Sequence, residues 1–157
     1  MDLLVRLYDV VGLNELDFFK DKDIIIKRPI GAEKNAVVEW VRNKFSAGWA
    51  SECDVALSKT PPTCFIAVKN LQIVGFACYD ATVKNFFGPI GVIEGFRKSG
   101  IGKALLIKTL KQMYYDGYAY AVIGWAGPVD FFKKTVGACE IEGSVSSVYL
   151  NLIKSRE

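Results

Sequence analysis

Apolar positions along the chain change their spacing from segment to segment, and this spacing predicts where helices and strands lie. Val37, Val41 and Phe45 recur once per helical turn with charged residues between them, which predicts a helix over 33–45. Gly48 ends this pattern. A second apolar stripe with helical spacing follows, made of Trp49, Cys53, Ala56 and Leu57. The first half of the chain therefore contains two consecutive amphipathic helices.

The pattern changes to β-rich runs after Pro61 and Pro62. Segments 63–69 and 72–79 are rich in β-forming residues and only two residues separate them, which predicts a hairpin. A third run covers 86–92 and contains Pro89. Because proline cannot donate a ladder hydrogen bond, we expect a bulge or an unpaired edge there.

The clearest helical pattern lies in the second half, over 102–115, where an apolar stripe alternates with outward lysines. The remaining predicted elements are a strand over 118–125, a short helix over 128–136, and strands over 138–141 and 147–152. Near the start, Ile24–Ile26 predicts a strand. Residues 1–20 are ambiguous, since Leu3, Val5 and Leu7 alternate as in a strand while 13–19 fits a short helix.

This element order, β-α-α-β-β-β-α-β-α-β-β, is typical of a single α+β domain. The chain has 157 residues, of which 51% are hydrophobic and 24% charged, and that profile fits one folded domain over 1–157. The net charge of +3 comes without a block of like charges. A nucleic-acid-binding protein is therefore not expected, whereas a small anionic ligand suits the mild positive charge.

Composition also limits the chemistry. The chain has no histidine, which excludes a Cys–His pair, a Ser–His–Asp triad and any histidine-based metal site. Its four cysteines are Cys53, Cys64, Cys78 and Cys139. Their spacing matches no zinc pattern and each has apolar neighbours, so we expect reduced thiols, no metal and a cytoplasmic location.

No targeting or membrane segment is predicted. Asp2 and Arg6 interrupt the apolar residues at the N-terminus, which argues against a signal peptide. The longest uncharged run, 117–129, is shorter than the ~20 residues that cross a bilayer.

The segment 92–106 carries the most specific chemical signal. A strand leads into a basic turn that contains Gly100 and Gly102, and this turn opens the predicted helix. The first amides of a helix lack internal partners and carry partial positive charge, so they can bind an anion. The glycines let a phosphate approach the backbone, and Arg97, Lys98 and Lys103 add positive charge.

Three interpretations of this turn compete with an ordinary glycine-containing turn. A dinucleotide fingerprint needs a third glycine where Leu105 stands, and a P-loop needs a Gly-Lys-Ser/Thr sequence that is absent. The third pattern, Arg-x-x-Gly-x-Gly, fits residues 97–102 throughout. The strand before it and the amphipathic helix after it favour this third interpretation.

On these residues the chain resembles the GNAT superfamily of acetyl-CoA-dependent N-acetyltransferases. Residues 97–102 match its Arg/Gln-x-x-Gly-x-Gly/Ala signature, and the element order agrees from Ile24 to Tyr149. The resemblance implies a three-layer α/β/α fold with a core over about 24–150. It also implies a mixed, mostly antiparallel, twisted sheet that splays open between its fourth and fifth strands.

The resemblance further implies a binding site for acetyl-CoA. Pantetheine would lie along the fourth strand, pyrophosphate on the turn, and the thiol end against the last short helix. The implied cofactor-binding residues are Ile90, Gly91, Val92, Arg97, Lys98, Ser99, Gly100, Ile101, Gly102, Lys103, Phe131 and Phe132. Under this assignment, Gly100→Glu is expected to abolish coenzyme A binding and leave the fold intact.

The chain departs from the family pattern at two positions. Phe132 stands where the family often has a tyrosine that protonates coenzyme A, and Phe132 cannot donate a proton. Trp125-Ala126 stands where an asparagine is common near the end of the fifth strand. Water or another tyrosine would then protonate the thiolate, or catalysis would be slow.

No general base is evident from the sequence. Asp80, after the third strand, is the candidate, although a turn residue in solvent fits the same pattern. The other acidic and aromatic residues that we considered for the acceptor side are Glu52, Asp54, Glu94, Trp40, Trp49, Tyr79 and Tyr149. Each of them also fits a surface or core role.

Three hypotheses follow from the sequence. The first is an N-acetyltransferase that acts on a small-molecule or protein amine by direct attack. The second is a coenzyme A-binding module with weak or no catalysis, which Phe132 favours. The third is an interaction domain that keeps only the fold. We expect no nucleic-acid or membrane partner, and the resemblance implies a homodimer through the C-terminal strands.

Overall fold

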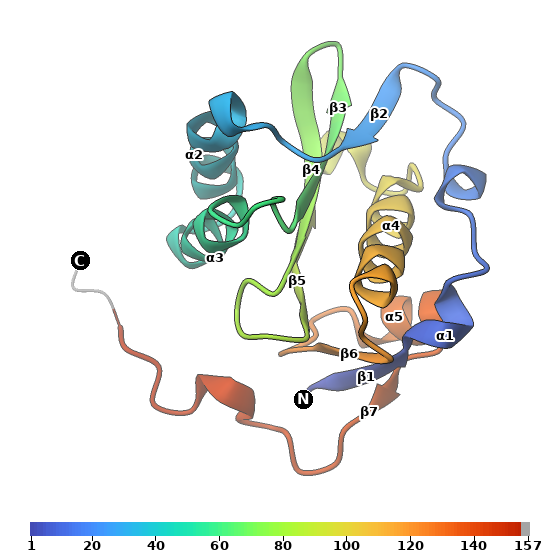
Figure 1. Cartoon of the computed structure of the whole chain (residues 1–157), viewed down its shortest axis with the longest axis vertical. Helices are drawn as coiled ribbons and strands as arrows, with labels where there is room; N and C mark the ends of the chain where they lie inside the picture. Colours follow the sequence, from blue (N-terminus) through green and yellow to red (C-terminus); the bar gives the residue numbers. More distant parts are fainter. Residues whose placement is uncertain (155–157) are drawn as a thin grey trace.

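The computed structural model describes residues 1–154, which fold around one seven-stranded sheet with helices on both faces (Figure 1). The strands are β1 (Leu3–Arg6), β2 (Ile24–Lys27), β3 (Cys64–Lys69), β4 (Gln72–Tyr79), β5 (Phe86–Val92), β6 (Tyr120–Ile123) and β7 (Cys139–Glu140). Their order in the sheet is β2-β3-β4-β5-β6-β1-β7. Only the β5–β6 pair is parallel among these strands, so the mixed, mostly antiparallel sheet is confirmed.

Two helical layers cover the sheet. The α-helices are α1 (Leu7–Val10), α2 (Lys34–Lys44), α3 (Ala47–Leu57), α4 (Ile101–Tyr115) and α5 (Val129–Val136). The 3₁₀ helices are η1 (Glu15–Phe18), η2 (Gly31–Glu33), η3 (Glu94–Phe96) and η4 (Ser147–Tyr149). Helices α2 and α3 lie on one face, and α4, α1 and α5 lie on the other. The three-layer α/β/α fold is confirmed.

The sheet separates two hydrophobic cores because neighbouring residues of a strand point to opposite faces. On β4, Phe76 and Cys78 pack with the helices α2 and α3, whereas Ala77 and Tyr79 pack in the core that contains α4. Helix α4 is the centre of the larger core, and its Leu105, Leu106 and Leu110 are fully buried there. The ends of α3 and α4 are thereby fixed on opposite faces of the sheet.

The sheet opens between β5 and β6. These strands pair only at Phe86–Val122 and Phe87–Ile123, and the rest of β5 has no partner on that side within the described chain. Across the other edge of β5, the register against β4 shifts between Ala77 and Tyr79, opposite Pro89. The bulge and the unpaired edge predicted at Pro89 are both present, and the expected splay between these two strands is confirmed.

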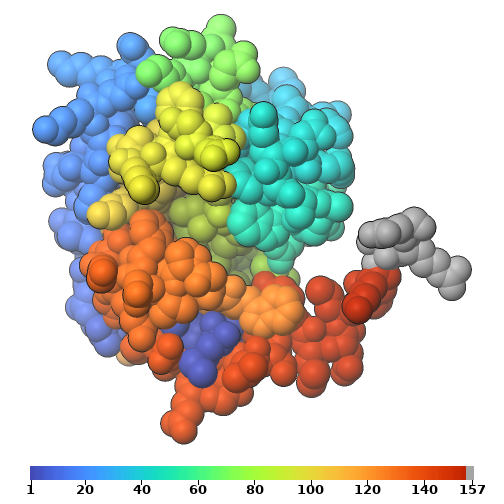
Figure 2. All heavy atoms as spheres, turned by 180° about the vertical axis from the view of Figure 1, so that it is seen from behind, coloured from blue at the N-terminus to red at the C-terminus, as the bar shows by residue number. Residues whose placement is uncertain are grey.

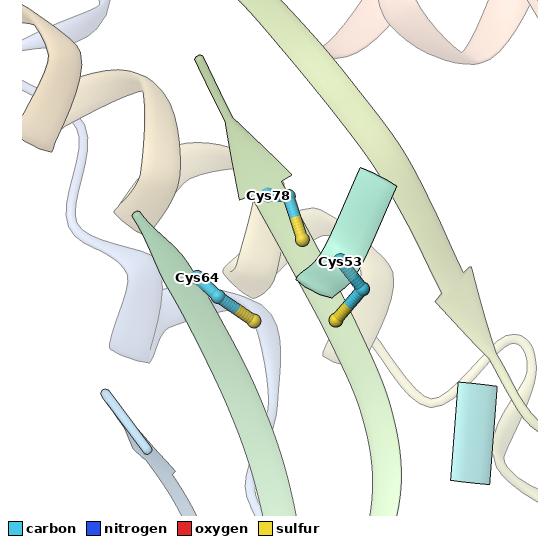
Figure 3. Close-up of side chains that lie close together, drawn as sticks. All are labelled: Cys53, Cys64 and Cys78. Atoms are coloured by element: carbon cyan, nitrogen blue, oxygen red, sulfur yellow. The ribbon is translucent and has the colours of Figure 1, made fainter. Parts of the chain in front are cut away.

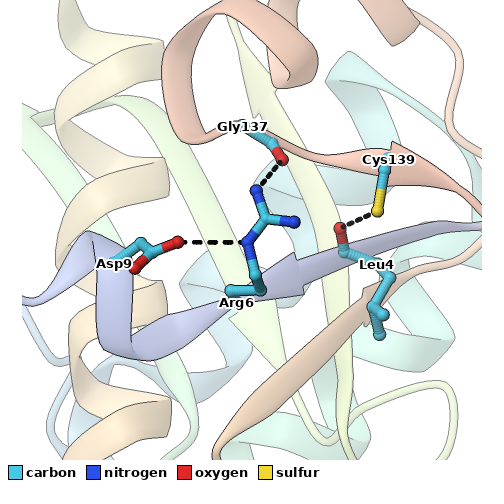
Figure 4. Close-up of polar contacts among 5 residues, drawn as sticks. All are labelled: Leu4, Arg6, Asp9, Gly137 and Cys139. Carbon is cyan, nitrogen blue, oxygen red and sulfur yellow. Dashed lines mark hydrogen bonds and ion pairs between the residues drawn. The ribbon is translucent and has the colours of Figure 1, made fainter.

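The N-terminal segment resolves the ambiguity of residues 1–20. Leu3–Arg6 forms a strand between β6 and β7, and Glu15–Phe18 forms a 3₁₀ helix within the predicted helical stretch. Figure 4 shows how β1 is fixed to its neighbours: Arg6 Nη2 donates to the Gly137 carbonyl at 3.4 Å and Nε donates to Asp9 at 3.0 Å. Cys139 Sγ lies 3.8 Å from the Leu4 carbonyl oxygen that accepts its proton.

The strand predicted over 147–152 is wrong. Ser147–Tyr149 forms the short helix η4, and no strand follows it within the described residues. The physical reason is that Ser147 and Asn151 adopt left-handed conformations, with φ values of +53° and +64°, which interrupt an extended strand. The strand predicted over 138–141 is present as β7, and it pairs with the far side of β1.

Candidate functional site

The start of α4 forms a cradle of free backbone amides. Gly100 is the residue before the helix and has a φ of +89°, and Lys98 has a φ of +64°. The side chain of Ser99 donates to the Phe96 carbonyl, which tightens the turn. Gly100 itself has no side chain to cap the helix, and the Ile101 amide donates only a long bond of 3.5 Å to Ser99 Oγ. The Gly102 and Lys103 amides that follow have no acceptor among the described residues and remain available to an anion.

A cavity of about 640 Å³ opens at this turn. Its walls are Asp17, Phe18, Val92, Phe96, Arg97, Lys98, Ser99, Gly100, Gly102, Lys103 and Phe131. The three cations in this wall form no ion pair with any residue of 1–154, whereas Asp17 is the one carboxylate beside them. The positive wall and the helix N-terminus together suit a polyanionic group such as a diphosphate.

The two glycines of the turn have different physical roles. A Cβ on Gly100 would lie 1.6 Å from the Phe18 carbonyl oxygen, so no side chain fits there. A Cβ on Gly102 would meet nothing closer than Val92 Cγ2 at 3.8 Å, and Gly102 lines the cavity. The expectation that Gly100→Glu leaves the fold intact is therefore wrong, and Gly102 is the position that tests anion binding.

A second cavity of about 860 Å³ lies where β5 and β6 diverge, on the side of α3. Figure 2 shows the surface hollowed between α3 (teal) and the segment after β6 (orange), with the green atoms of β5 set back between them. Its walls are Ala47, Gly48, Trp49, Ser51, Glu52, Thr82, Phe87, Gly88, Pro89, Ile90, Ile123, Gly124, Trp125, Ala126, Gly127, Pro128, Phe132, Tyr149, Leu152 and Ile153. We name it the gap cavity.

The polar groups of the gap cavity are few and close together. Thr82 Oγ1 donates to Glu52 Oε1 at 2.6 Å, and Glu52 Oε2 accepts no bond from any described residue. Tyr149 stacks on Trp125 with ring centroids 4.4 Å apart. Burial raises the pKa of Tyr149, and a hydrogen bond with Thr82 opposes that rise. The polar side chains of this wall are thus one carboxylate, one phenol and the hydroxyls of Ser51 and Thr82, and most of its other side chains are apolar.

Asp2 holds the C-terminal segment against the end of β6. Its Oδ1 accepts from the Trp125 amide at 2.9 Å and its Oδ2 accepts from Ser147 Oγ at 2.7 Å. The Asp2 amide donates to Ser144 Oγ at 2.9 Å, and the residue is 6% exposed. These bonds position Tyr149 over the gap cavity. No local pattern predicts this role, because Asp2 and Ser147 lie near opposite ends of the sequence.

The predicted cofactor-binding residues divide between the two cavities. The residues that line the cavity at the start of α4 are Val92, Arg97, Lys98, Ser99, Gly100, Gly102, Lys103 and Phe131. Ile90 and Phe132 line the gap cavity. The Ile101 side chain is fully buried, and the Cα of Gly91 faces the Phe45 ring, which a Cβ would meet at 2.5 Å. For these two residues only backbone atoms can reach a ligand.

The candidate base Asp80 lies outside both cavities. Its Oδ1 accepts from the Asn85 amide at 2.7 Å and its Oδ2 accepts from the Tyr118 hydroxyl at 2.8 Å. Burial and then this bond raise the pKa of Tyr118 to about 12. Both carboxylate oxygens thus hold a turn together. The role of base stays a prediction, and this placement gives it no support.

The other residues considered for the acceptor side also separate into two groups. Glu52, Trp49 and Tyr149 line the gap cavity. The residues elsewhere are Asp54, which pairs with Lys34 at 2.9 Å; Glu94, which is exposed on η3; Trp40, which packs on Phe76; and Tyr79, which donates to Asp116. Sequence spacing did not separate these groups, because the gap cavity draws on segments far apart in the chain.

Three of the cysteines lie together in the core under α3. The sulfurs of Cys53, Cys64 and Cys78 lie within 4.8 Å of one another and come from α3, β3 and β4 (Figure 3). All three residues are buried among apolar side chains, and burial raises the pKa of Cys78 well above its ordinary value. We interpret the cluster as the packing of small thiols in the core between α3 and the sheet.

The sheet opens beside a helix start that contains two glycines, and a cavity lies on each side of the opening. This is the arrangement that the resemblance to the acetyltransferase family implied. Residues 34–134, more than half of the chain, match the model of the Acetyltransferase (GNAT) family. The chain belongs to this family. No curated protein matches the chain in sequence.

Solved structures have the same fold. The GCN5-related glucosamine N-acetyltransferase region of a fungal multi-domain GH3 β-N-acetylglucosaminidase is 13% identical with a TM-score of 0.66, covering 86% of this chain and 19% of its own. A GCN5-related N-acetyltransferase from Sphaerobacter thermophilus is 18% identical with a TM-score of 0.66, covering 88% of this chain and 47% of its own. This chain thus spans less than half the length of either protein, and the likeness shows the fold alone.

Proposed function

We propose that the chain binds acetyl-CoA and transfers its acetyl group to a primary amine by direct attack. The observation that carries the proposal is the cradle at the start of α4, where helix amides, Gly102 and three cations line one cavity, and these cations pair with no carboxylate of residues 1–154. The diphosphate of coenzyme A is the polyanion that this arrangement suits. Family membership supports acetyl-CoA as the donor.

The two substrates would approach from opposite faces of the sheet. The cradle lies at the start of α4, and the gap cavity lies beside α3, which covers the other face. Between them, β5 beyond Phe87 pairs with no strand of residues 1–154 on the β6 side. Its free backbone groups can pair with the amides of pantetheine, which would direct the thioester toward the gap cavity. Such positioning of both reactants supplies much of the rate acceleration.

In the proposed reaction, the neutral amine nitrogen attacks the thioester carbonyl carbon, and the carbon–sulfur bond then breaks. The nitrogen loses one proton before the attack and a second one after it, and the departing thiolate gains one proton. Phe132, which is 2% exposed, cannot supply that proton. Tyr149 is the phenol among the described residues that line the gap cavity, and we assign the proton transfer to it.

Phe132 also favours a second candidate function, a coenzyme A-binding module with little catalysis. The two candidates share the cradle and differ in turnover. Binding of acetyl-CoA without thiol release in the presence of amines would support the second candidate.

The cradle is tested at Gly102. A glutamate there places a carboxylate beside the helix amides, where it stabilises the helix and repels a diphosphate. We expect Gly102→Glu to raise the Kd of acetyl-CoA at least tenfold in a calorimetric titration, whereas Gly102→Ala, which adds no charge, changes it much less. Equal affinity for acetyl-CoA in a folded Gly102→Glu protein would contradict the assignment.

A further inference from the structure

We infer that the acceptor is a small primary monoamine on an aromatic or branched apolar body, and that its ammonium group binds Glu52. This inference rests on the proposed function, because it takes the gap cavity as the acceptor site. It specifies a substrate class that family membership leaves open, since acceptors depend on the residues of each individual site.

The charge of the gap cavity favours a single ammonium group. Among its described lining residues Glu52 is the only charged one. Thr82 binds one carboxylate oxygen at 2.6 Å, which fixes the group and leaves Oε2 for a ligand. A polyamine would bring a second ammonium group that finds no second carboxylate in this wall. Burying that unpaired ammonium group has a desolvation free energy that the other contacts of the polyamine do not offset.

The rest of the wall favours an apolar body. Aromatic rings come from Trp49, Phe87, Trp125, Phe132 and Tyr149. The Trp125 ring is fixed by its stack on Tyr149 and by its Nε1 proton, which goes to the Val145 carbonyl at 3.0 Å. Ile90, Leu152 and Ile153 add aliphatic side chains. Besides Glu52, the polar side chains of the wall are Ser51, Thr82 and Tyr149, and the Thr82 proton already goes to Glu52. An amino sugar has more hydroxyl groups than these side chains can pair, and unpaired polar groups are strongly rejected.

The dimensions favour a small molecule over a protein chain. A volume of about 860 Å³ lies in the range of small-molecule pockets. Aromatic faces around the carboxylate add cation–π attraction for one ammonium group. Glu52 then has two tasks: it orients the ammonium group, and it takes the first proton, which passes on to water before the neutral nitrogen attacks.

Calorimetric titration of the coenzyme A-saturated protein tests the substrate class. We expect 2-phenylethylamine to bind with a Kd at least tenfold lower than spermidine, glucosamine or a lysine-containing peptide. Equal or tighter binding of any of these three, or no binding of 2-phenylethylamine, would overturn the inference. A failure of coenzyme A itself to bind would instead overturn the proposed function, and the amine titrations can still be made on the free protein.

A Glu52→Gln variant tests the anchor. We expect it to raise the Kd of 2-phenylethylamine at least tenfold and to leave the Kd of 2-phenylethanol, which has the same body without the ammonium group, within twofold. Asp54→Asn is the matched control, because Asp54 lies on the same helix and pairs with Lys34 outside the cavity. If Glu52→Gln changes the two ligands equally, or if Asp54→Asn has the same effect, Glu52 is not the anchor.

Discussion

At the scale of single residues, the proposed proton donor, Tyr149, lies outside the last short helix, where the resemblance places a tyrosine. Phe132 occupies the wall of the gap cavity with a ring that carries no hydroxyl, while Tyr149 reaches the same wall from η4. Burial raises the pKa of Tyr149, so the phenol stays protonated through the neutral range and can act as an acid. The chemistry expected of the last short helix is thus available from a residue near the C-terminus.

Tyr149→Phe should lower kcat for acetyl transfer by roughly 10²-fold, the usual contribution of a general acid. The KM for acetyl-CoA should stay within about twofold, because the cradle is on the other face. Since the pKa of Tyr149 is raised, the wild-type rate should not fall through loss of this proton until the pH exceeds about 10, the ordinary value for tyrosine. Tyr115→Phe, at an exposed residue of α4, serves as the control, and equal rates for both variants would exclude Tyr149 as the acid.

At the scale of elements, the start of α4 is closed by η1. The Phe18 carbonyl lies against Gly100, and Glu15 of the same 3₁₀ helix pairs with Lys111 of α4 at 3.2 Å. The turn therefore keeps Gly100 for a steric reason as well as for its positive φ. Ligand binding alone does not explain the paired glycines.

Gly100→Ala should lower the free energy of unfolding by about 3 kcal/mol, because it combines a left-handed conformation with a clash against fixed backbone. Gly102→Ala should instead raise it by about 0.5–1 kcal/mol, since alanine favours the helix and the Cβ has space. Urea denaturation of the two variants measures both values. Similar denaturation midpoints for the two variants would contradict the clash between a side chain at position 100 and the Phe18 carbonyl.

The Asp2 bonds link the two ends of the chain at the gap cavity. Asp2→Ala should lower the free energy of unfolding by about 1–2 kcal/mol, because the partly buried hydrogen bonds from Trp125 and Ser147 lose their acceptor. The segment 141–153 should also become more sensitive to limited proteolysis. Asp9→Ala removes only an exposed ion pair with Arg6 and should cost less than about 1 kcal/mol. Unchanged proteolysis in Asp2→Ala would show that other contacts hold this segment.

The spacing of apolar residues predicted most of the helices and strands, because the residues that show this spacing lie within each element itself. It failed where contacts between distant segments decide the backbone. Residues 147–152 alternate like a strand, yet Ser147 has a positive φ and its hydroxyl donates to Asp2 near the other end of the sequence. Nothing in the segment 147–152 alone predicts that contact.

At the scale of the whole molecule, the two halves of the site differ in how far sequence could predict them. The cradle is continuous in sequence, so one motif with its strand and helix was enough to locate it. The gap cavity combines Glu52, Thr82, Trp125 and Tyr149, which only the folded sheet brings together. From the sequence, Glu52 and Tyr149 were only two of several acidic and aromatic candidates, and no pattern ranked them above the others.

Among the helices of residues 1–154, none has the length and apolar character that a membrane-spanning helix needs.

In the proposed reaction, the acetyl group of acetyl-CoA is joined to an amine across the opening in the sheet. Mass-spectrometric detection of the N-acetylated amine, together with thiol release, from acetyl-CoA and 2-phenylethylamine tests this reaction. We expect saturable formation of both products in equal amounts, and strong loss of both in Gly102→Glu but not in Gly102→Ala. Product formation no faster than without the protein, or equal rates in the two Gly102 variants, would contradict it.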